Sequence, residues 1–285
     1  MKEIMLTKRA LDRLKEYELD GIISTESTLY YLKKYYDKPN VLLKKLFTPT
    51  NKIIDSKVRT IEEISSRKEL QDIKELVIPE NLVVLSGQAI GFSIQEIDKS
   101  TNLGIYLKRK DVPMKKKIEI VEKVGKIIER TTNLEKNFFF TDLHEFNFLI
   151  DENELLYAVD LDSSRVNSDE AISSKYLSTD KKLQKVNKYN VNSSGLAYPD
   201  KNSEIYCYNM MVLNLISNHK INRLRYDDYY EYLDFLYKEG VSEELLDPLS
   251  RMYTEQDNLL ITSIENNIPK EKDISFEAHK KRLIK

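Results

Sequence analysis

The spacing of apolar residues changes near residue 100, and this change restricts the fold more than any other feature of the chain. Between residues 21 and 97, short runs rich in β-branched and aromatic residues are typical of β-strands. These runs are residues 22–32, 41–47, 82–85 and 89–94. Residues 61–76 have helical spacing, with an expected break at Ser65 and Ser66. The first third therefore predicts a small antiparallel sheet with one helix.

After Asn102 the apolar residues recur every three or four positions, which predicts helices. The clearest stripe lies within residues 115–130, and further helices are expected at residues 204–216, 226–237, 243–253 and 255–266. Three short strands are expected between them, at residues 138–140, 146–150 and 155–159, with residues 151–154 as a turn. Residues 163–194 are polar and predict a long surface segment. The fold class is α+β, with domains at residues 1–96, an N-terminal extension and β-rich lobe, and 97–285, a helical lobe.

Charge and cysteine content exclude several classes of protein. Lys and Arg total 45 against 47 Asp and Glu, so the net charge of −2 gives no reason to expect a nucleic-acid partner. Cys207 is the single cysteine, which excludes an intramolecular disulfide and favours a reducing compartment. The first residues are too charged for a secretion signal, and the most apolar helical stretch, residues 210–216, is too short to cross a bilayer. A cytoplasmic location without a membrane span is therefore expected.

Polar residues follow or precede apolar strands at three places in the middle of the chain. Asp142, Asn147 and Asp160 all stand at such strand ends, where side chains from neighbouring strands converge. Oxygen ligands from Asn147 and Asp160 suit Mg²⁺, which keeps several waters and takes its other ligands from substrate phosphates. Asp142 then stands ahead of the phosphate, where it can orient an attacking hydroxyl and accept its proton.

These residues give the chain a resemblance to the protein kinase superfamily over most of residues 20–240. Residues 142–147, Asp-Leu-His-Glu-Phe-Asn, resemble the Asp-Leu-His-x-x-Asn catalytic loop of aminoglycoside phosphotransferase-like and other atypical kinases. Residues 160–162 resemble the magnesium-binding Asp-Phe-Gly segment, with Asp162 in place of glycine. Residues 198–200 stand where Ala-Pro-Glu ends an activation segment, and Glu204 replaces the usual Asp of the following helix. The resemblance implies a two-lobed protein kinase-like fold.

The resemblance also implies a nucleotide-binding set in the first lobe. Residues 41–44, Val-Leu-Leu-Lys, resemble the Val-Ala-Ile-Lys strand, which implies that Lys44 pairs with the α and β phosphates of ATP. Its helix partner is then Glu62 or Glu63, of which Glu63 is favoured. The phosphate loop corresponds to residues 21–28, where Ser24 and Thr25 supply hydroxyls in place of the missing glycines.

The expected activity is Mg-ATP-dependent transfer of the γ-phosphoryl group to a hydroxyl acceptor. A protein Ser/Thr acceptor is weakly favoured over a small molecule, because residues 198–208 look more like protein kinases although the loop resembles small-molecule kinases. Two other hypotheses remain open beside this activity. One is a catalytically inactive pseudokinase that acts as a binding module, and the other is a phosphate-binding protein or nuclease that uses the carboxylates around a metal without ATP. His144 is expected to be structural, and Cys207 to be a core residue.

Overall fold

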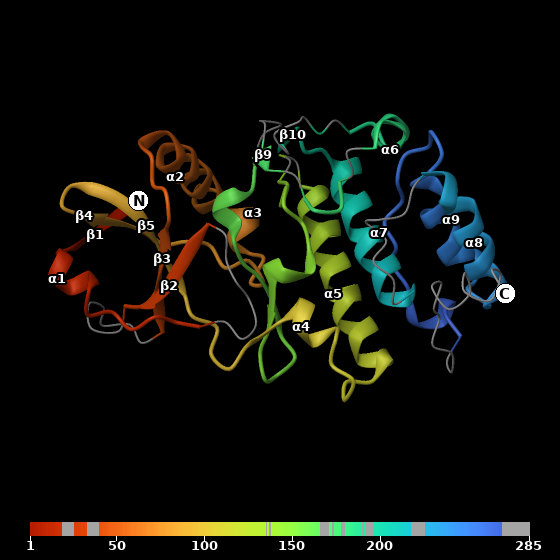
Figure 1. Cartoon of the computed structure of the whole chain (residues 1–285), viewed down its shortest axis with the longest axis horizontal. Helices are drawn as coiled ribbons and strands as arrows, with labels where there is room; N and C mark the ends of the chain where they lie inside the picture. Colours follow the sequence, from red (N-terminus) through yellow and green to blue (C-terminus); the bar gives the residue numbers. More distant parts are fainter. Residues whose placement is uncertain are drawn as a thin grey trace. The chain divides into compact units, whose positions relative to one another are not determined.

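The computed structural model describes residues 1–18, 26–32, 40–134, 136, 138–165, 171–172, 174–177, 180–189, 191, 196–217 and 226–269. Its elements form two compact units (Figure 1). Unit 1 comprises Met1–Ile105 and Phe146–Val166, and unit 2 comprises Tyr106–Glu145 and Asn167–Lys285. Within the described ranges, no helix combines the length and apolar character needed to cross a bilayer.

Unit 1 is built on a five-stranded sheet with the strand order β1-β4-β5-β3-β2. Its strands are β1 (Lys2–Leu6), β2 (Ser27–Tyr31), β3 (Val41–Leu46), β4 (Asn81–Leu85) and β5 (Gln88–Gln95). The four predicted strand regions are confirmed where they are described. The sheet is mixed and not antiparallel, because β1 pairs in parallel with β4. This strand lies where the sequence predicted only an N-terminal extension, since two of its five residues are charged.

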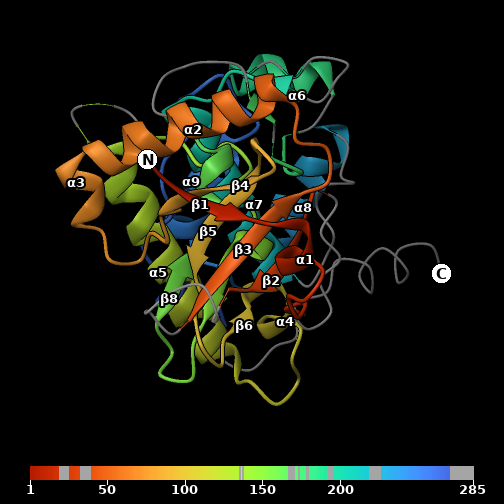
Figure 2. The same ribbon diagram turned by 90° about the vertical axis from the view of Figure 1, so that its left-hand side faces the viewer.

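Helix α2 (Asn51–Ser66) lies across one face of this sheet (Figure 2). Its Ile54 and Ile61 pack against Leu46 of β3 and Phe92 of β5. The side chain of Thr50 caps the helix by accepting a hydrogen bond from the amide of residue 53 at 3.3 Å. The helix ends at the predicted break and is followed by α3 (Lys68–Gln71), but it begins ten residues earlier than predicted.

A second sheet of unit 1 has the order β6-β7-β8. Strands β7 (Phe148–Ile150) and β8 (Leu156–Ala158) form the predicted hairpin, and β6 (Thr101–Asn102) pairs with β7 before α4 (Leu103–Tyr106). The hairpin turn is held by Asp151, whose Oδ1 accepts the amide hydrogens of Asn153 and Leu155 at 2.9 and 2.8 Å. The predicted boundary after residue 96 had assigned this hairpin to the second lobe. In the structure it lies in unit 1, where the amide of Ala158 donates to the carbonyl of Glu75 at 2.7 Å.

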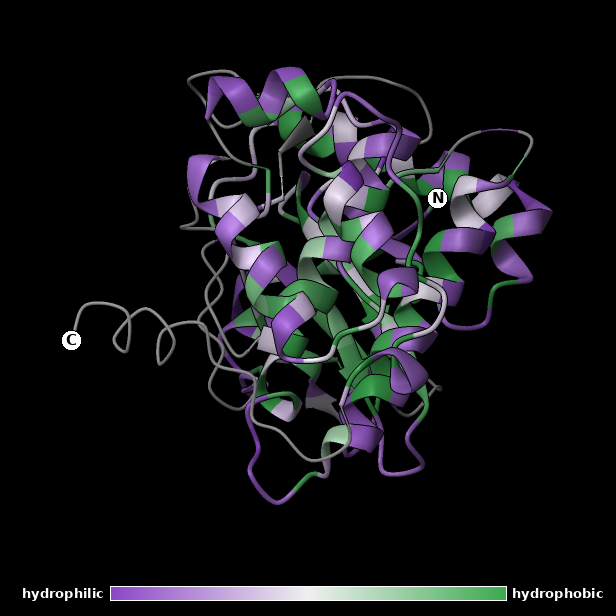
Figure 3. Ribbon diagram, turned by 90° about the vertical axis from the view of Figure 1, so that its right-hand side faces the viewer, coloured by the Kyte–Doolittle hydropathy of each residue, from purple (hydrophilic) through white to green (hydrophobic). Residues whose placement is uncertain are grey.

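Unit 2 is mainly helical, and its central helix α7 is buried almost all round. The helices of this unit are α5 (Met114–Thr132), α6 (Lys181–Val186), α7 (Lys201–Ser217), α8 (Tyr229–Lys238) and α9 (Glu243–Arg251). Figure 3 shows hydrophobic and hydrophilic residues side by side along several helices, as expected of amphipathic helices packed on a core. A close approach of α5 to α7 depends on Gly125, since a Cβ there would lie 2.5 Å from the hydroxyl of Tyr208.

Three expectations for unit 2 are wrong. Residues 255–266 do not form a helix; they run as irregular chain up to a short 3₁₀ turn, Glu265–Asn267. Residues 138–140 are buried but form none of the strands in the described part of the chain. The segment predicted to lie on the surface, residues 163–194, buries several described side chains and carries α6 and the short strand β9 (Ala171–Ile172), which pairs with β10 (Leu196–Ala197). Its buried side chains include Ser174, Tyr176, Leu183 and Tyr189.

Candidate functional site

Lys44 occupies a central strand of the unit 1 sheet. Strand β3 pairs with β2 on one side and β5 on the other, so its backbone is fixed in register, with Lys44 opposite Leu29 and Phe92. Adjacent residues of a strand point to opposite faces. The structure buries the side chain of Lys44 and leaves Lys45 only half-buried. From the sequence, Lys44 was favoured over Lys45 as the lysine that points toward the nucleotide.

Two aspartates from the segment after β8 meet the ammonium group of Lys44. The Lys44 Nζ donates to Oδ1 of Asp160 and, at 2.7 Å, to Oδ1 of Asp162. Asp160 adopts the left-handed backbone conformation, with φ 68° and ψ 29°, just before the 3₁₀ turn Leu161–Ser163. The two aspartates differ in access: the side chain of Asp160 is 31% exposed, whereas that of Asp162 is 1% exposed.

A second lysine, Lys57 of α2, contacts the same buried aspartate. Its Nζ lies 2.8 Å from Oδ2 of Asp162 and 2.9 Å from the hydroxyl of Ser163. Glu26 lies farther away, at 3.9 Å. The cluster of Asp160, Lys44, Asp162 and Lys57 is therefore a chain of alternating charges, which we call the Lys44 cluster.

The charges of the Lys44 cluster shift the pKa values of its buried members. Burial alone lowers the pKa of an ammonium group and raises that of a carboxyl group. The charges of Asp160 and Asp162 outweigh burial and hold the pKa of Lys44 above its usual range. Likewise, Lys44 and Lys57 outweigh burial and hold the pKa of Asp162 well below its usual range. Both groups are therefore charged at neutral pH.

Asn147 and Asp160 lie at the same end of the β7–β8 hairpin. Phe148 pairs with Ala158, and the carbonyl of Asn147 accepts the amide hydrogen of Val159 at 2.9 Å. Within the described ranges, no group of three or more His, Cys, Asp or Glu side chains is arranged to hold a metal ion. The sequence predicts Asn147 and Asp160 as oxygen ligands of Mg²⁺, an ion that takes few protein ligands and completes its shell with water and phosphate oxygens.

Asp142 belongs to a loop of unit 2 with a strained backbone. Thr141 before it has a φ of 64°, an unusual conformation for a β-branched residue. His144 Nε2 lies 3.3 Å from Oδ2 of Asp142. The loop is tied down next to this pair, because the amide and hydroxyl of Ser174 donate to the carbonyls of Thr141 and Leu143 at 3.0 and 2.5 Å.

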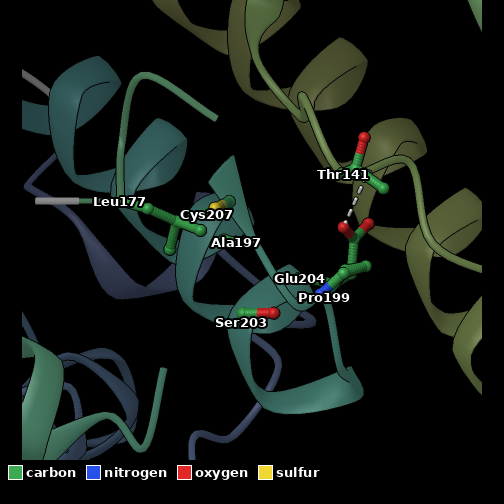
Figure 4. A pocket seen from close by; sticks show the side chains of 7 residues that line it. All are labelled: Thr141, Leu177, Ala197, Pro199, Ser203, Glu204 and Cys207. Carbon is green, nitrogen blue, oxygen red and sulfur yellow. Dashed lines mark hydrogen bonds between the residues drawn. The ribbon is translucent and has the colours of Figure 1, made fainter. Parts of the chain in front are cut away.

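Glu204 of α7 also contacts this loop, through Thr141 (Figure 4). Its two carboxyl oxygens accept the amide hydrogens of Phe140 and Thr141 at 3.0 and 2.9 Å. Burial raises the pKa of Glu204 to about 7, although these two hydrogen bonds act in the opposite direction. The pocket beside it, lined also by Pro199 and Cys207, has no room for a water molecule. Glu204 therefore stabilises the loop through these two amides, and the pocket is too small to hold a ligand.

Glu145 extends this support at the end of the loop. Its carboxylate accepts hydrogen bonds from Lys175 Nζ and the hydroxyl of Tyr176, each at 2.6 Å. Burial opposes ionisation of Glu145, but Lys175 and the two hydrogen bonds hold its pKa below the usual range. The contacts of residues 174–176 were not predicted, because this segment carries no regular apolar pattern.

Of the remaining predicted site residues, two are not described by the structure and the third does not pair as predicted. Ser24 and Thr25 lie outside the described residues. The expected pairing of Lys44 with Glu63 or Glu62 is wrong within the described chain, because the ion pairs of Lys44 go to aspartates of another segment. Glu62 is exposed on α2.

Lys57 was missed, although the sequence contains a signal for it. It stands three residues after Ile54 and four before Ile61, which places a lysine on the apolar stripe of α2. A cation at such a position requires a buried anion near it. Comparison of the sequence with protein-family models and with curated proteins finds no match.

Proposed function

We propose that the chain is an ATP-dependent phosphotransferase that transfers the γ-phosphoryl group of Mg-ATP to a hydroxyl acceptor. The observation that carries the proposal is the ion pair between Lys44 and Asp160. These residues are 116 positions apart in the chain. The strand end assigns Asp160 to the metal, and the resemblance to protein kinases assigns Lys44 to the phosphates. A purely structural ion pair has no need to join these two particular residues.

The side chains have distinct roles in the proposed reaction. Lys44 neutralises phosphate charge, and the partly exposed carboxylate of Asp160 binds Mg²⁺ together with Asn147. The metal supplies charge stabilisation on the phosphate oxygens when it is bound. Asp142 orients the acceptor hydroxyl and takes its proton, while His144 fixes one oxygen of that carboxylate. Most of the rate enhancement then comes from positioning and charge stabilisation.

The acceptor is proposed to be a protein Ser or Thr, with a small-molecule hydroxyl as the competing substrate class. A panel of peptides and a panel of polyhydroxylated or aminoglycoside-type small molecules, each incubated with labelled ATP and Mg²⁺, separates the two. Label on a peptide or on the protein itself supports the first class. Label confined to small molecules replaces it with the second.

The test of the activity itself compares wild type with Asp142→Asn. We expect both proteins to bind ATP in the presence of Mg²⁺, and the variant to transfer phosphate about 10²- to 10⁴-fold more slowly, because it lacks the proton acceptor. The exposed Asp55→Asn is the matched control, which removes the same charge from a helix surface. ATP binding without transfer to any acceptor by the wild type supports the inactive binding module instead. Metal binding with no affinity for ATP supports the nucleotide-independent alternative.

A further inference from the structure

Asp162 has no role in the proposed reaction, yet it is the most buried charge of the Lys44 cluster. Both of its carboxylate oxygens are engaged: Oδ1 lies 2.7 Å from Lys44 Nζ and Oδ2 lies 2.8 Å from Lys57 Nζ. Its side chain is 1% exposed. A carboxylate bound to two ammonium groups in this way does not serve as a metal ligand. Asp162 must therefore act through the lysines that it contacts.

Lys57 is equally unusual for a residue of its type. Its side chain is 12% exposed and lies on the face of α2 that packs against the sheet, between two buried isoleucines. Lysine is rarely buried unless it is paired, because removing its ammonium group from water is unfavourable. Its nearest anion is Asp162, since Glu26 is 3.9 Å away and half-exposed. Helix α2 therefore fixes the second oxygen of Asp162.

This arrangement gives Lys44 two counter-ions of different kinds. Asp160 is partly exposed and is the oxygen donor assigned to Mg²⁺. If Asp160 bound a metal ion, Lys44 would lose one anion but would keep Asp162, whose other oxygen accepts a hydrogen bond from Lys57. Without such a fixed anion, a buried ammonium group would move toward water or lose its proton.

We propose that Asp162 and Lys57 are positioning residues that hold Lys44 in place for the phosphates of the nucleotide. Asp162 is the permanent counter-ion of Lys44, and Lys57 anchors Asp162 to α2. The nucleotide part of this inference rests on the proposed function. The counter-ion part does not, because it concerns the protein without ligand.

The first experiment therefore uses no nucleotide. The ε-amine of Lys44 is acylated with a low concentration of acetic anhydride at pH 8, and labelling is measured by mass spectrometry. The side chain of Lys44 is 8% exposed while Asp162 holds it, so removal of this buried partner lets the amine reach the reagent. We expect labelling to rise about tenfold or more in Asp162→Asn, because the buried anion that holds the ammonium group at 2.7 Å is lost and an unpaired buried ammonium group moves toward water. Labelling equal to wild type in a folded variant overturns the counter-ion role of Asp162.

Because Asp162→Asn leaves two buried lysines without this anion, a second variant protects the test against misfolding. The double variant Lys57→Met/Asp162→Asn removes one cation and one anion, so the local net charge is unchanged. It leaves Lys44 paired with Asp160 alone. We expect it to fold and still to show increased labelling of Lys44. A folded double variant that protects Lys44 as well as wild type does also overturns the inference.

The role of Lys57 is tested with the catalytic assay. Lys57→Met is expected to raise the KM for ATP roughly 10- to 100-fold, a range typical of residues that orient a ligand-binding group. The KM for the acceptor should not change. A lower kcat with both KM values unchanged would indicate only a loss of folded enzyme. That result would overturn the positioning role of Lys57. Lys57→Arg keeps the charge and should restore much of the affinity for ATP.

Lys52→Met is the matched control, because Lys52 is an exposed lysine of the same helix. It should leave the labelling of Lys44 and both KM values at wild-type levels. If the wild type neither binds ATP nor transfers phosphate, the proposed function fails. The labelling results for Asp162 then still decide whether it is the counter-ion of Lys44.

Discussion

Asp162 in unit 1 and Glu204 in unit 2 are buried to nearly the same extent, at 1% and 2% exposure, but their pKa values shift in opposite directions. Asp162 contacts two ammonium groups, and its pKa is held far below the usual range. Glu204 accepts two backbone amide hydrogens and has aspartates as its charged neighbours, and burial raises its pKa to about 7. Partner charge therefore decides the protonation state where burial is equal. One unit carries a permanent ion cluster, and the other a carboxyl group that titrates near neutrality.

The largest expected effect comes from breaking the ion cluster of unit 1. We expect Asp162→Asn to lower the free energy of unfolding by about 3–5 kcal/mol, because it leaves two buried lysines without a shared anion. Denaturant unfolding monitored by circular dichroism at pH 7 measures this change. Asp55→Asn, on the exposed side of α2, should change it very little. A small effect of Asp162→Asn would mean that water already reaches the cluster.

The second prediction concerns the pH dependence caused by Glu204. Its pKa is raised from 4.5 to about 7 in the folded protein, so the folded state binds a proton more tightly than the unfolded state. The stabilisation is fully present below about pH 4.5 and is lost as the pH rises through 7. A shift of this size corresponds to about 3 kcal/mol. Unfolding measured at intervals from pH 5 to pH 8 should show the decline.

Glu204→Gln is the control for that decline, because a glutamine at this position does not titrate. The variant loses one of the two acceptors for the amides of Phe140 and Thr141, so it should be less stable at pH 5 by about 1–3 kcal/mol. Its stability should then fall less between pH 5 and pH 8. The same slope in both proteins would show that another group causes the pH dependence.

The smallest effect is expected at Glu145, which combines features of both carboxyl groups. Lys175 and Tyr176 hold its pKa below the usual range, but the lysine is 35% exposed. This stabilisation is present above the unfolded pKa of 4.5 and is lost as the pH falls through the lower folded pKa. Lys175→Met should therefore lower stability at pH 7 by about 1 kcal/mol. Titration of Glu145 by NMR should show a higher pKa in the variant, and no rise would contradict the assigned cause.

Much of unit 1 follows from local patterns in the sequence. The runs at residues 41–47 and 82–94 became strands because β-branched and apolar residues fit a pleated, buried surface. The hairpin with Asn147 at one end was predictable because Asp151 supplies its turn. Strand β1 was not, since its parallel partner lies some 80 residues away and two of its own five residues are charged.

The candidate site was only partly predictable for the same reason. Lys44 and Asp160 could be named from their positions at an apolar strand and after another one. Their pairing with Asp162 and Lys57 depends on segments more than 100 residues apart, which no local pattern encodes. The sequence placed the partner of Lys44 on α2 as a glutamate. The structure instead has a lysine on that helix, and the carboxylate comes from the segment after β8.

Unit 1 is assembled from two separated stretches of chain, Met1–Ile105 and Phe146–Val166, and this has a consequence for synthesis on the ribosome. When residue 105 has been made, Lys44 and Lys57 have already been synthesised, but Asp160 and Asp162 have not. At about 5–20 residues per second, roughly 3–12 seconds pass before residue 166 is added. During this interval two lysines destined for the interior lack their anions, so the first stretch stays solvated there. Unit 1 is therefore completed only after all of helix α5 of unit 2 has been synthesised.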